Sequence, residues 1–202
     1  GLESKKDILV GELNKNPIEI LENGYKFNVD VVNGQKTGFY LDQRENRKAI
    51  QKYINNRDVL NCFSYSGGFT VYALGAEAKH VTSIDSSFEA IEQAKINVSK
   101  NQLSEDKNTW IVGDVFKELR LFRDKGMSFD NIILDPPKFA PTAAQVRSAS
   151  RGYKDINLLA FKLLKPGGIL MTFSCSGGLD RLLFQKIIAD AAIDAGVNAQ
   201  IL

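Results

Sequence analysis

The amino-acid sequence predicts an α/β fold whose core is a mostly parallel, doubly wound β-sheet preceded by a small β-hairpin. Short apolar runs alternate with longer segments in which apolar residues recur at helical spacing. This alternation indicates crossover units, which place helices on both faces of a parallel sheet. Before the first run, alternating apolar and polar residues around an Asn-Gly pair indicate the hairpin.

Length and composition are those of one ordinary globular domain. The chain has 202 residues, of which 44% are hydrophobic and 25% charged, enough for a sizeable core. No apolar run approaches the roughly 18 residues that span a bilayer, and the polar start is unlike a signal peptide. We therefore expect a cytoplasmic protein without a membrane partner. Because the chain does not begin with Met, we also expect an excised fragment.

The numbers of cysteine and histidine residues and the net charge exclude some classes of function. Two cysteines, Cys62 and Cys175, and one histidine, His80, cannot form a paired-cysteine zinc site, so we expect no metal. A disulfide between the cysteines is disfavoured in a reducing compartment. The net charge of +2 is no polycation signal, so contact with nucleic acid requires a local basic patch.

The N-terminal quarter is predicted to form an arm, a β-hairpin and a linking helix. Residues 1–24 are polar and weakly patterned, so we interpret them as an arm. Residues 25–41 alternate around Asn33-Gly34, a pair that favours a tight turn because both turn positions need positive φ. Residues 43–54, rich in Arg, Lys and Glu, are predicted to be a helix.

Residues 55–202 carry the strand–helix alternation and are predicted to form the main domain, after an N-terminal unit of residues 1–54. The five apolar runs are residues 59–63, 81–84, 110–112, 131–134 and 169–173. In such a sheet, ligands bind beyond the carboxyl ends of the strands. We therefore expect the site in the segments after the runs, which are residues 64–68, Asp85, Ser86, Gly113, Asp114, 135–138 and 174–176.

The loop after the first run favours a nucleoside cofactor without phosphates, and S-adenosylmethionine (SAM) is such a molecule. Gly67 and Gly68 let a ligand approach the backbone, yet the loop has neither a Gly-x-Gly-x-x-Gly pattern nor a P-loop Gly-Lys-Ser/Thr. Asp85 ends the second run, where a carboxylate accepts hydrogen bonds from ribose hydroxyls. Asp114 ends the third run and is expected on the adenine side. Either carboxylate could instead cap the helix that follows it.

The loop after the fourth run indicates recognition of a planar base. In Asp135-Pro136-Pro137-Lys138, two prolines hold the chain extended. We expect the loop to present the Asp135 carboxylate to the base, with Phe139 stacking on it. Asp/Asn-Pro-Pro-aromatic loops occur in methyltransferases that modify exocyclic amines, but Lys138 departs from that pattern.

Cys175 follows the fifth run and is the candidate nucleophile. Strands four and five are neighbours in the expected sheet, so Cys175 would lie beside Asp135. Carbon 5 of a pyrimidine is a poor nucleophile, and a thiolate that adds to carbon 6 makes it electron-rich enough to accept a methyl group. Lys138 would assist electrostatically, and Asp135 would bind the N3 and amino edge of cytosine. Cys62, inside the first run, is expected to be buried.

Two basic groups are candidates for RNA contact. The first lies in residues 136–154, interpreted as a mobile loop over the site, and consists of Lys138, Arg147, Arg151 and Lys154. The second is interrupted by acidic residues and consists of Arg44, Arg47, Lys48 and Lys52. A run of charged residues more often forms only a solvent-exposed surface, so contact between these groups and RNA phosphates is a hypothesis. The target base would have to leave its stack.

Longer motifs resemble those of the bacterial rRNA large subunit methyltransferase I family, which makes 5-methylcytosine in 23S rRNA. The motifs are residues 34–47, 61–69, 135–139, 151–157 and 172–177. The resemblance implies a class I, Rossmann-like SAM-dependent methyltransferase fold, SAM as methyl donor, 23S rRNA as partner and Cys175 as nucleophile. It implies that SAM is surrounded by Gln43, Phe63, Tyr65, Gly67, Asp85, Asp114 and Asp135, to which we add Ser64 and Ser86.

The family also has an N-terminal PUA RNA-binding domain and a final antiparallel hairpin in its sheet. The chain carries neither and stops at Leu202, so the resemblance implies a C-terminally truncated domain. A homodimer is considered as the assembly. The alternatives are an rRNA N-methyltransferase acting on a purine amine, uridine carbon-5 methylation and a non-catalytic SAM- or RNA-binding module. A nicotinamide oxidoreductase is disfavoured by the missing glycine pattern.

Overall fold

The computed structural model describes residues 8, 10–34, 38–139 and 146–202. Its centre is a five-stranded parallel sheet with the strands β3 (Asp58–Cys62), β4 (His80–Asp85), β5 (Asn108–Val112), β6 (Phe129–Leu134) and β7 (Leu164–Thr172). In the strand order β5-β4-β3-β6-β7, the chain first adds strands on one side of β3 and then on the other, as in doubly wound folds. The predicted fold class is therefore confirmed, and β6 and β7 are neighbours as expected.

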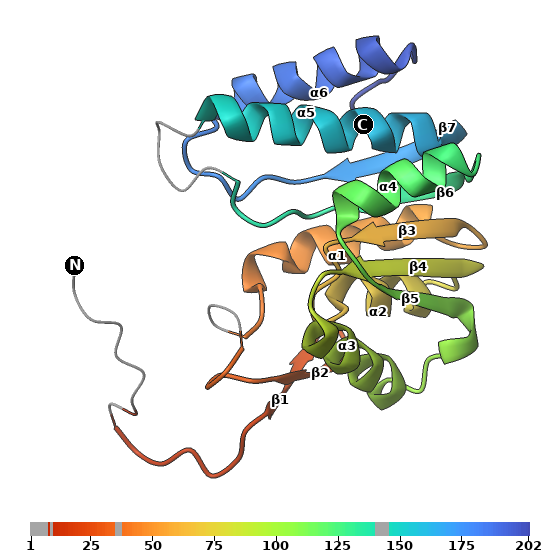
Figure 1. The fold of residues 1–202 in the computed structure, drawn as a ribbon. Coiled ribbons are helices and arrows are strands. Elements are labelled where there is room, and N and C mark those ends of the chain that lie inside the picture. Colours follow the sequence, from red (N-terminus) through yellow and green to blue (C-terminus); the bar gives the residue numbers. More distant parts are fainter. Residues whose placement is uncertain (1–7, 9, 35–37, 140–145) are drawn as a thin grey trace.

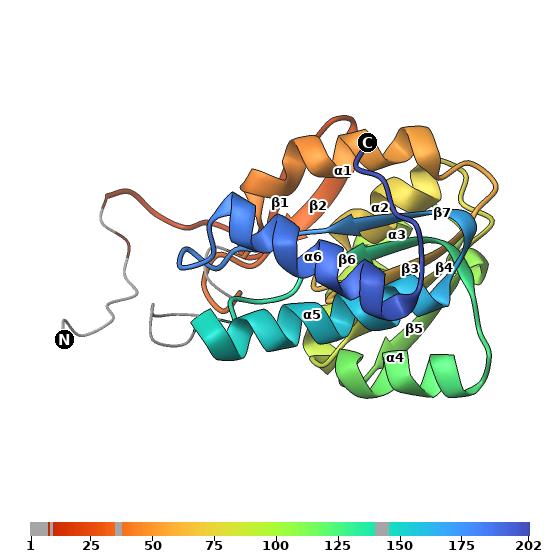
Figure 2. The ribbon, with the colours of Figure 1, turned by 90° about the horizontal axis from the view of Figure 1, so that it is seen from above.

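Six α-helices accompany the sheet: α1 (Arg44–Ile50), α2 (Gly68–Gly75), α3 (Phe88–Lys100), α4 (Val115–Asp124), α5 (Val146–Leu163) and α6 (Arg181–Ala195), among the described residues. Single 3-10 turns lie at Leu41–Gln43, Gln51–Tyr53 and Glu105–Lys107. α1, α2 and α3 cover one face of the sheet, and α4 and α5 cover the other (Figures 1 and 2). α6 packs mainly against α5.

Burial on both faces explains why the strands are visible in the sequence as apolar runs. Along β6, Ile132 and Leu134 belong to the core beneath α4 and α5, whereas Ile133 belongs to the core beneath α2. Successive side chains of a strand point to opposite faces, so a strand covered on both sides carries apolar residues on both faces rather than at alternate positions only.

The N-terminal hairpin exists, but it lies earlier in the chain than predicted. β1 (Ile18–Glu22) and β2 (Tyr25–Val29) pair antiparallel through Asn23-Gly24, whose φ values of 49° and 89° suit a tight two-residue turn. The interpretation of residues 1–24 as an arm is therefore wrong for the segment that forms β1. Buried residues of β2 share a core cluster with α1 and α2, so the hairpin is part of the globular body.

Asp30 explains why Asn33-Gly34 is not the hairpin turn. Its Oδ1 accepts hydrogen bonds from the backbone N–H groups of Val32 (2.9 Å) and Asn33 (2.7 Å), which closes the chain into a local turn. Neither Asn33 nor Gly34 has positive φ. Of the expected second strand, residues 38–41 contain no strand, and Thr37 lies outside the described residues.

One further segment differs from the sequence prediction. The expected mobile basic loop over residues 136–154 is wrong for residues 146–154, because α5 begins at Val146; residues 140–145 lie outside the described ranges. The pairing of β7 with β6 contains a bulge at residues 165–168, since Leu164 pairs with Phe129 and the next pair joins Ile169 to Asn131. Beyond this bulge β7 stays in register with β6, so the loops after both strands emerge side by side.

Candidate active site

A cavity of about 740 Å³ opens at the carboxyl edge of the sheet, a volume that suits a nucleoside-sized ligand. Its wall combines the loops after β3, β4, β6 and β7 with the segment between β2 and α1. The residues singled out from the sequence that line it are Gln43, Arg47, Phe63, Ser64, Tyr65, Gly68, Asp85, Ser86, Asp135, Pro136, Pro137 and Cys175. The structure therefore brings together four of the five expected segments, whereas the one after β5, with Gly113 and Asp114, does not line the cavity.

The loop after β3 has a strained backbone. Phe63, Tyr65 and Gly67 have φ values of 60°, 46° and 77°, a region that only glycine enters readily. Such strain costs about 1–3 kcal/mol for each non-glycine residue and collects at ligand sites. A Cβ on Gly67 would lie 2.7 Å from the Cβ of Ala94, so glycine is also required for the contact with α3.

Asp85 joins this loop to the start of α3. Its Oδ2 accepts a hydrogen bond from the backbone N–H of Tyr65 (2.8 Å), and its Oδ1 accepts one from that of Ser87 (3.0 Å). Ser87 caps α3, because its side chain accepts a hydrogen bond from the N–H of Ala90. The carboxylate of Asp85 is thus held in place, and its acceptor capacity also allows hydrogen bonds from ribose hydroxyls.

Asp135 is oriented from the N-terminal side of the chain. Gln43 Nε2 donates to Asp135 Oδ1 at 2.9 Å, and Asn46 Nδ2 donates to Gln43 Oε1 at 2.7 Å. The second hydrogen bond fixes the Gln43 amide so that its N–H groups face the carboxylate. Residues before the sheet therefore set the position of a side chain that follows β6.

The two cysteines have opposite environments. Cys175 is exposed and lines the cavity, and its Sγ lies 3.7 Å from the carbonyl oxygen of Pro136. Cys62 is fully buried in β3, and burial raises the pKa of its thiol, which opposes ionisation. The predicted burial of Cys62 is confirmed, and Cys175 is the cysteine that shares the cavity with Asp135.

Tyr40 is a wall residue to which the sequence analysis gave no role. Burial raises the pKa of its hydroxyl, and the neighbouring Tyr65, Cys175 and Asp135 raise it further. The hydroxyl is therefore protonated at neutral pH and able to donate a hydrogen bond. Its ring meets that of Tyr65 edge-on, with 5.5 Å between the centroids. Tyr40 lies within the motif of residues 34–47, which could have marked it as a site residue. The prediction of a hairpin over residues 25–41 assigned it to a strand instead.

Arg47 is buried, which corrects its interpretation as a phosphate ligand. Its Nε and Nη2 each donate to one carboxylate oxygen of Glu22 at 2.8 Å, and Nη2 also donates to the Tyr40 carbonyl at 2.9 Å. The guanidinium carbon lies 4.6 Å from the centre of the Phe39 ring. These contacts engage Nε and Nη2 of the guanidinium and tie β1 to the cavity wall.

Other predicted site residues lie away from the cavity wall. Among the described residues, those outside the lining are Gly67, Asp114, Lys138, Arg147, Arg151 and Lys154. Asp114 caps α4, where its Oδ1 accepts a hydrogen bond from the N–H of Lys117 at 3.0 Å. Lys154 forms an ion pair with Asp194 at 2.7 Å. Lys138, Arg147 and Arg151 are exposed.

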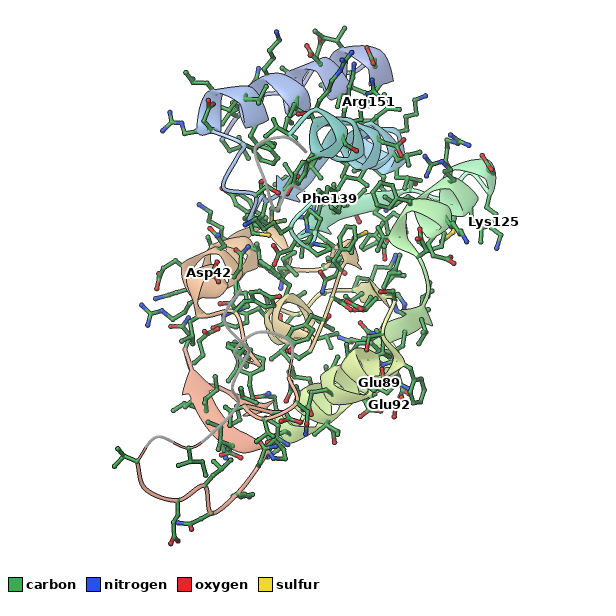
Figure 3. The ribbon with its side chains drawn as sticks, turned by 60° about the vertical axis from the view of Figure 1, so that its left-hand side comes forward. Asp42, Glu89, Glu92, Lys125, Phe139 and Arg151 are labelled. Atoms are coloured by element: carbon green, nitrogen blue, oxygen red, sulfur yellow. The ribbon has the colours of Figure 1, made fainter. Side chains whose placement is uncertain are left out.

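Phe139 does not stand ready to stack on a base, as the sequence suggested. It lies beneath α5, with Arg151 farther out on that helix and Asp42 near the start of α1 (Figure 3). Its ring packs in an aromatic cluster with those of Phe63, Phe116 and Tyr153, at centroid distances of 6.4, 5.8 and 4.8 Å. Phe139 therefore anchors the Asp-Pro-Pro loop from behind.

In the described part of the chain, no group of three or more His, Cys, Asp or Glu side chains comes together in a way that could hold a metal ion. None of the helices described is long and apolar enough to cross a membrane.

Comparison with known proteins identifies the family. A model of the S-adenosylmethionine-dependent methyltransferase family matches residues 3–191. Over its full length the chain is 55% identical to the ribosomal RNA large subunit methyltransferase I of Aeromonas salmonicida and 52% identical to that of Pseudoalteromonas translucida. It covers 51% of each relative, about half of their length. The resemblance seen in the sequence motifs is therefore confirmed.

A solved structure supports the same assignment. The crystal structure of SMU.776, a methyltransferase complexed with SAH, matches with a TM-score of 0.83 and 29% identity, over 91% of this chain and 48% of that one. The cavity fits SAM, since Ser64 Oγ is buried in its wall and has no hydrogen-bond partner among the described residues, a group that a ligand would satisfy. The chain belongs to the S-adenosylmethionine-dependent methyltransferase family.

Proposed function

We propose that the protein methylates carbon 5 of a cytosine in large-subunit ribosomal RNA through a covalent adduct between Cys175 and carbon 6. The observation that carries the proposal is the exposed Cys175 thiol at the cavity, 3.7 Å from the Pro136 carbonyl of the Asp-Pro-Pro loop. The relatives named ribosomal RNA large subunit methyltransferase I support the substrate class.

In this reaction, the thiolate of Cys175 adds to carbon 6 of the flipped cytosine, a bond forms between sulfur and carbon 6, and the ring electrons move toward carbon 5. N3 takes a proton from solvent, and the Asp135 carboxylate accepts hydrogen bonds from N3–H and the amino group. When bound, SAM would supply the electrophilic methyl group for carbon 5, with S-adenosylhomocysteine as the leaving group. Loss of the carbon-5 proton to a general base, return of the N3 proton to solvent and cleavage of the sulfur–carbon bond then restore the aromatic ring and the thiolate.

Asp135 is suited to this role because its carboxylate is preorganised. The Gln43 amide donates to Oδ1 and so fixes the orientation of the carboxylate at the cavity wall. A carboxylate pairs with cytosine only when N3 is protonated, so its hydrogen bonds strengthen as the thiolate adds. Asp135 therefore favours the adduct over the unreacted base.

Exposed basic residues near the site supply the contacts to RNA in this proposal. Arg147 and Arg151 lie on α5, and Lys138 lies in the Asp-Pro-Pro loop. Phosphate contacts of this kind position a nucleic acid without reading its sequence. Lys154 is assigned a weaker part, because its ammonium group already pairs with Asp194.

The test is to incubate the protein with SAM carrying a tritiated methyl group and with unmodified ribosomal RNA, and then to identify the labelled nucleoside. We expect label in 5-methylcytidine. Cys175→Ala should reduce the turnover by more than about 1000-fold, as loss of a nucleophile does in other enzymes. Cys62→Ala, which removes a thiol from the core, is the matched control and should retain turnover.

Each alternative predicts a different result of this experiment. Label in a purine, with turnover retained in Cys175→Ala, would establish an amine methyltransferase and overturn the adduct mechanism. Label in 5-methyluridine would keep the thiol chemistry and overturn the choice of base. Failure to bind SAM in calorimetry would indicate a non-catalytic module.

A further inference from the structure

We infer that Tyr153 is a positioning residue that holds the Cys175 loop and the Asp135 loop in register with each other. The inference rests on the proposed function and goes beyond it, because it assigns a role to a residue that touches neither cofactor nor substrate. Tyr153 lies on α5, is fully buried and lies outside the cavity lining among the described residues.

The hydroxyl of Tyr153 contacts both neighbours of Cys175. Ser174 Oγ donates to the Tyr153 hydroxyl at 3.0 Å, and that hydroxyl lies 3.1 Å from Ser176 Oγ. Because Tyr153 accepts from Ser174, it can donate its own hydrogen to Ser176, so a single hydroxyl satisfies both serines. The backbone N–H of Ser176 also donates to Ser174 Oγ at 3.3 Å. Cys175 is thereby held between two anchored residues.

The ring of Tyr153 contacts the other loop. It packs against Phe139 with 4.8 Å between the centroids, and against Phe184 of α6 edge-on at 5.5 Å. Phe139 ends the Asp-Pro-Pro-Lys-Phe segment that begins at Asp135. One side chain therefore contacts both loops that the proposed reaction brings together.

Accurate placement of the Cys175 loop matters because this loop carries the attacking sulfur of the proposed reaction. Cys175 and the two glycines after it are exposed, and residues 173–176 lie in neither helix nor strand. Misplacing a reacting group by about 1 Å lowers rates roughly a hundredfold. The buried contact behind the loop is therefore expected to act on the rate of sulfur addition rather than on cofactor binding.

Tyr153→Phe tests the inference, because it retains the ring and removes only the hydroxyl. We measure kcat, the Kd of SAM, and the rate of covalent adduct formation with RNA that contains 5-fluorocytidine, in which fluorine blocks the loss of the carbon-5 substituent. We expect kcat and the adduct rate to fall about tenfold or more, with the Kd of SAM within about twofold of wild type. Tyr25→Phe is the matched control: it removes a hydroxyl bonded to Gln51 at 3.0 Å, outside the cavity lining.

Ser174→Ala provides a second variant should Tyr153→Phe not fold. It should also slow adduct formation, and the double variant should lose less than the product of the two single effects, because both changes break the Ser174–Tyr153 contact. An adduct rate within twofold of wild type in the folded variants, or a loss explained by weaker SAM binding, overturns the inference. If wild type itself traps no adduct, the proposed function fails instead, so the two failures are distinguishable.

Discussion

Replacing Arg47 with methionine is expected to destabilise the fold strongly, because the change leaves the Glu22 carboxylate buried without its partner. Both side chains of this pair are only 4% exposed, and two hydrogen bonds of 2.8 Å join them. Removing one partner of a buried ion pair generally costs about 3–5 kcal/mol.

Two features of the structure move the estimate to the lower end of that range. The Tyr72 hydroxyl lies 3.0 Å from Glu22 Oε1 and continues to donate to it after the substitution. Methionine also retains apolar contact with Phe39, over which the guanidinium lies. We therefore expect a loss of about 3 kcal/mol, which lowers Tm by roughly 6–12 °C for a chain of this size.

The assay is thermal unfolding followed by circular dichroism, together with urea unfolding at 25 °C. Arg44→Met is the matched control on the same helix, because the Arg44–Glu45 pair is 59% and 73% exposed and its loss should change Tm by less than about 2 °C. The double variant Glu22→Leu with Arg47→Met should recover part of the loss, since no charge is then left buried. If Arg47→Met lowered Tm no more than Arg44→Met, the argument from the buried pair would be refuted.

Two further predictions concern the glycine loop and the far end of the sheet. Gly67→Ala adds a Cβ at a residue with φ 77°, 2.7 Å from the Cβ of Ala94 in α3, and should weaken SAM binding about tenfold in calorimetry. Gly126→Ala is the control, because Gly126 has a φ of 66° and open space around it, and SAM binding should not change. Burial raises the pKa of Asp130, but a backbone N–H and Lys165 outweigh burial and lower that pKa below its ordinary value. Asp130 therefore stabilises the fold above about pH 4, and this contribution is lost as the pH falls through the folded pKa. Lys165→Gln should raise that pKa and move the midpoint of acid unfolding to higher pH; an unchanged midpoint would contradict this reasoning.

The parallel sheet was predictable because its strands are buried on both faces. Ile132, Ile133 and Leu134 pack against opposite layers, and the resulting apolar run is visible without knowledge of the partners. The edge that carries the site follows from the same pattern, because parallel strands end on one side. Asp85, Asp135 and Cys175 could therefore be located on a common edge from the sequence.

The hairpin could not be located as securely, because two Asn-Gly pairs compete in the same segment. Asn23-Gly24 makes the turn with two positive φ values, and Asn33-Gly34 does not. The difference comes from Asp30, whose carboxylate captures two backbone N–H groups and bends the chain locally. Local side-chain capture of this kind competes with strand pairing and leaves no periodic signal.

The roles of charged and aromatic site residues depend on partners that sequence spacing does not reveal. Arg47 resembles its neighbours on α1, and only the proximity of Glu22, 25 residues away, makes it a buried structural group. Phe139 follows the Asp-Pro-Pro loop as a base-stacking residue would, yet it packs beneath α5. In both cases tertiary burial decided between two chemically reasonable roles.

The N-terminal segment, interpreted from the sequence as a linking unit, completes the site. An open parallel sheet presents its carboxyl edge to solvent, so the loops at that edge need a wall on the far side to exclude water and fix their side chains. Gln43 donates to Asp135, and Arg47 holds the Tyr40 carbonyl in that wall while its other contacts anchor the wall to β1. The segment before the sheet therefore sets the orientation of Asp135, which follows β6. Substitutions in α1 should therefore change the chemistry at Asp135 although α1 follows no strand of the sheet.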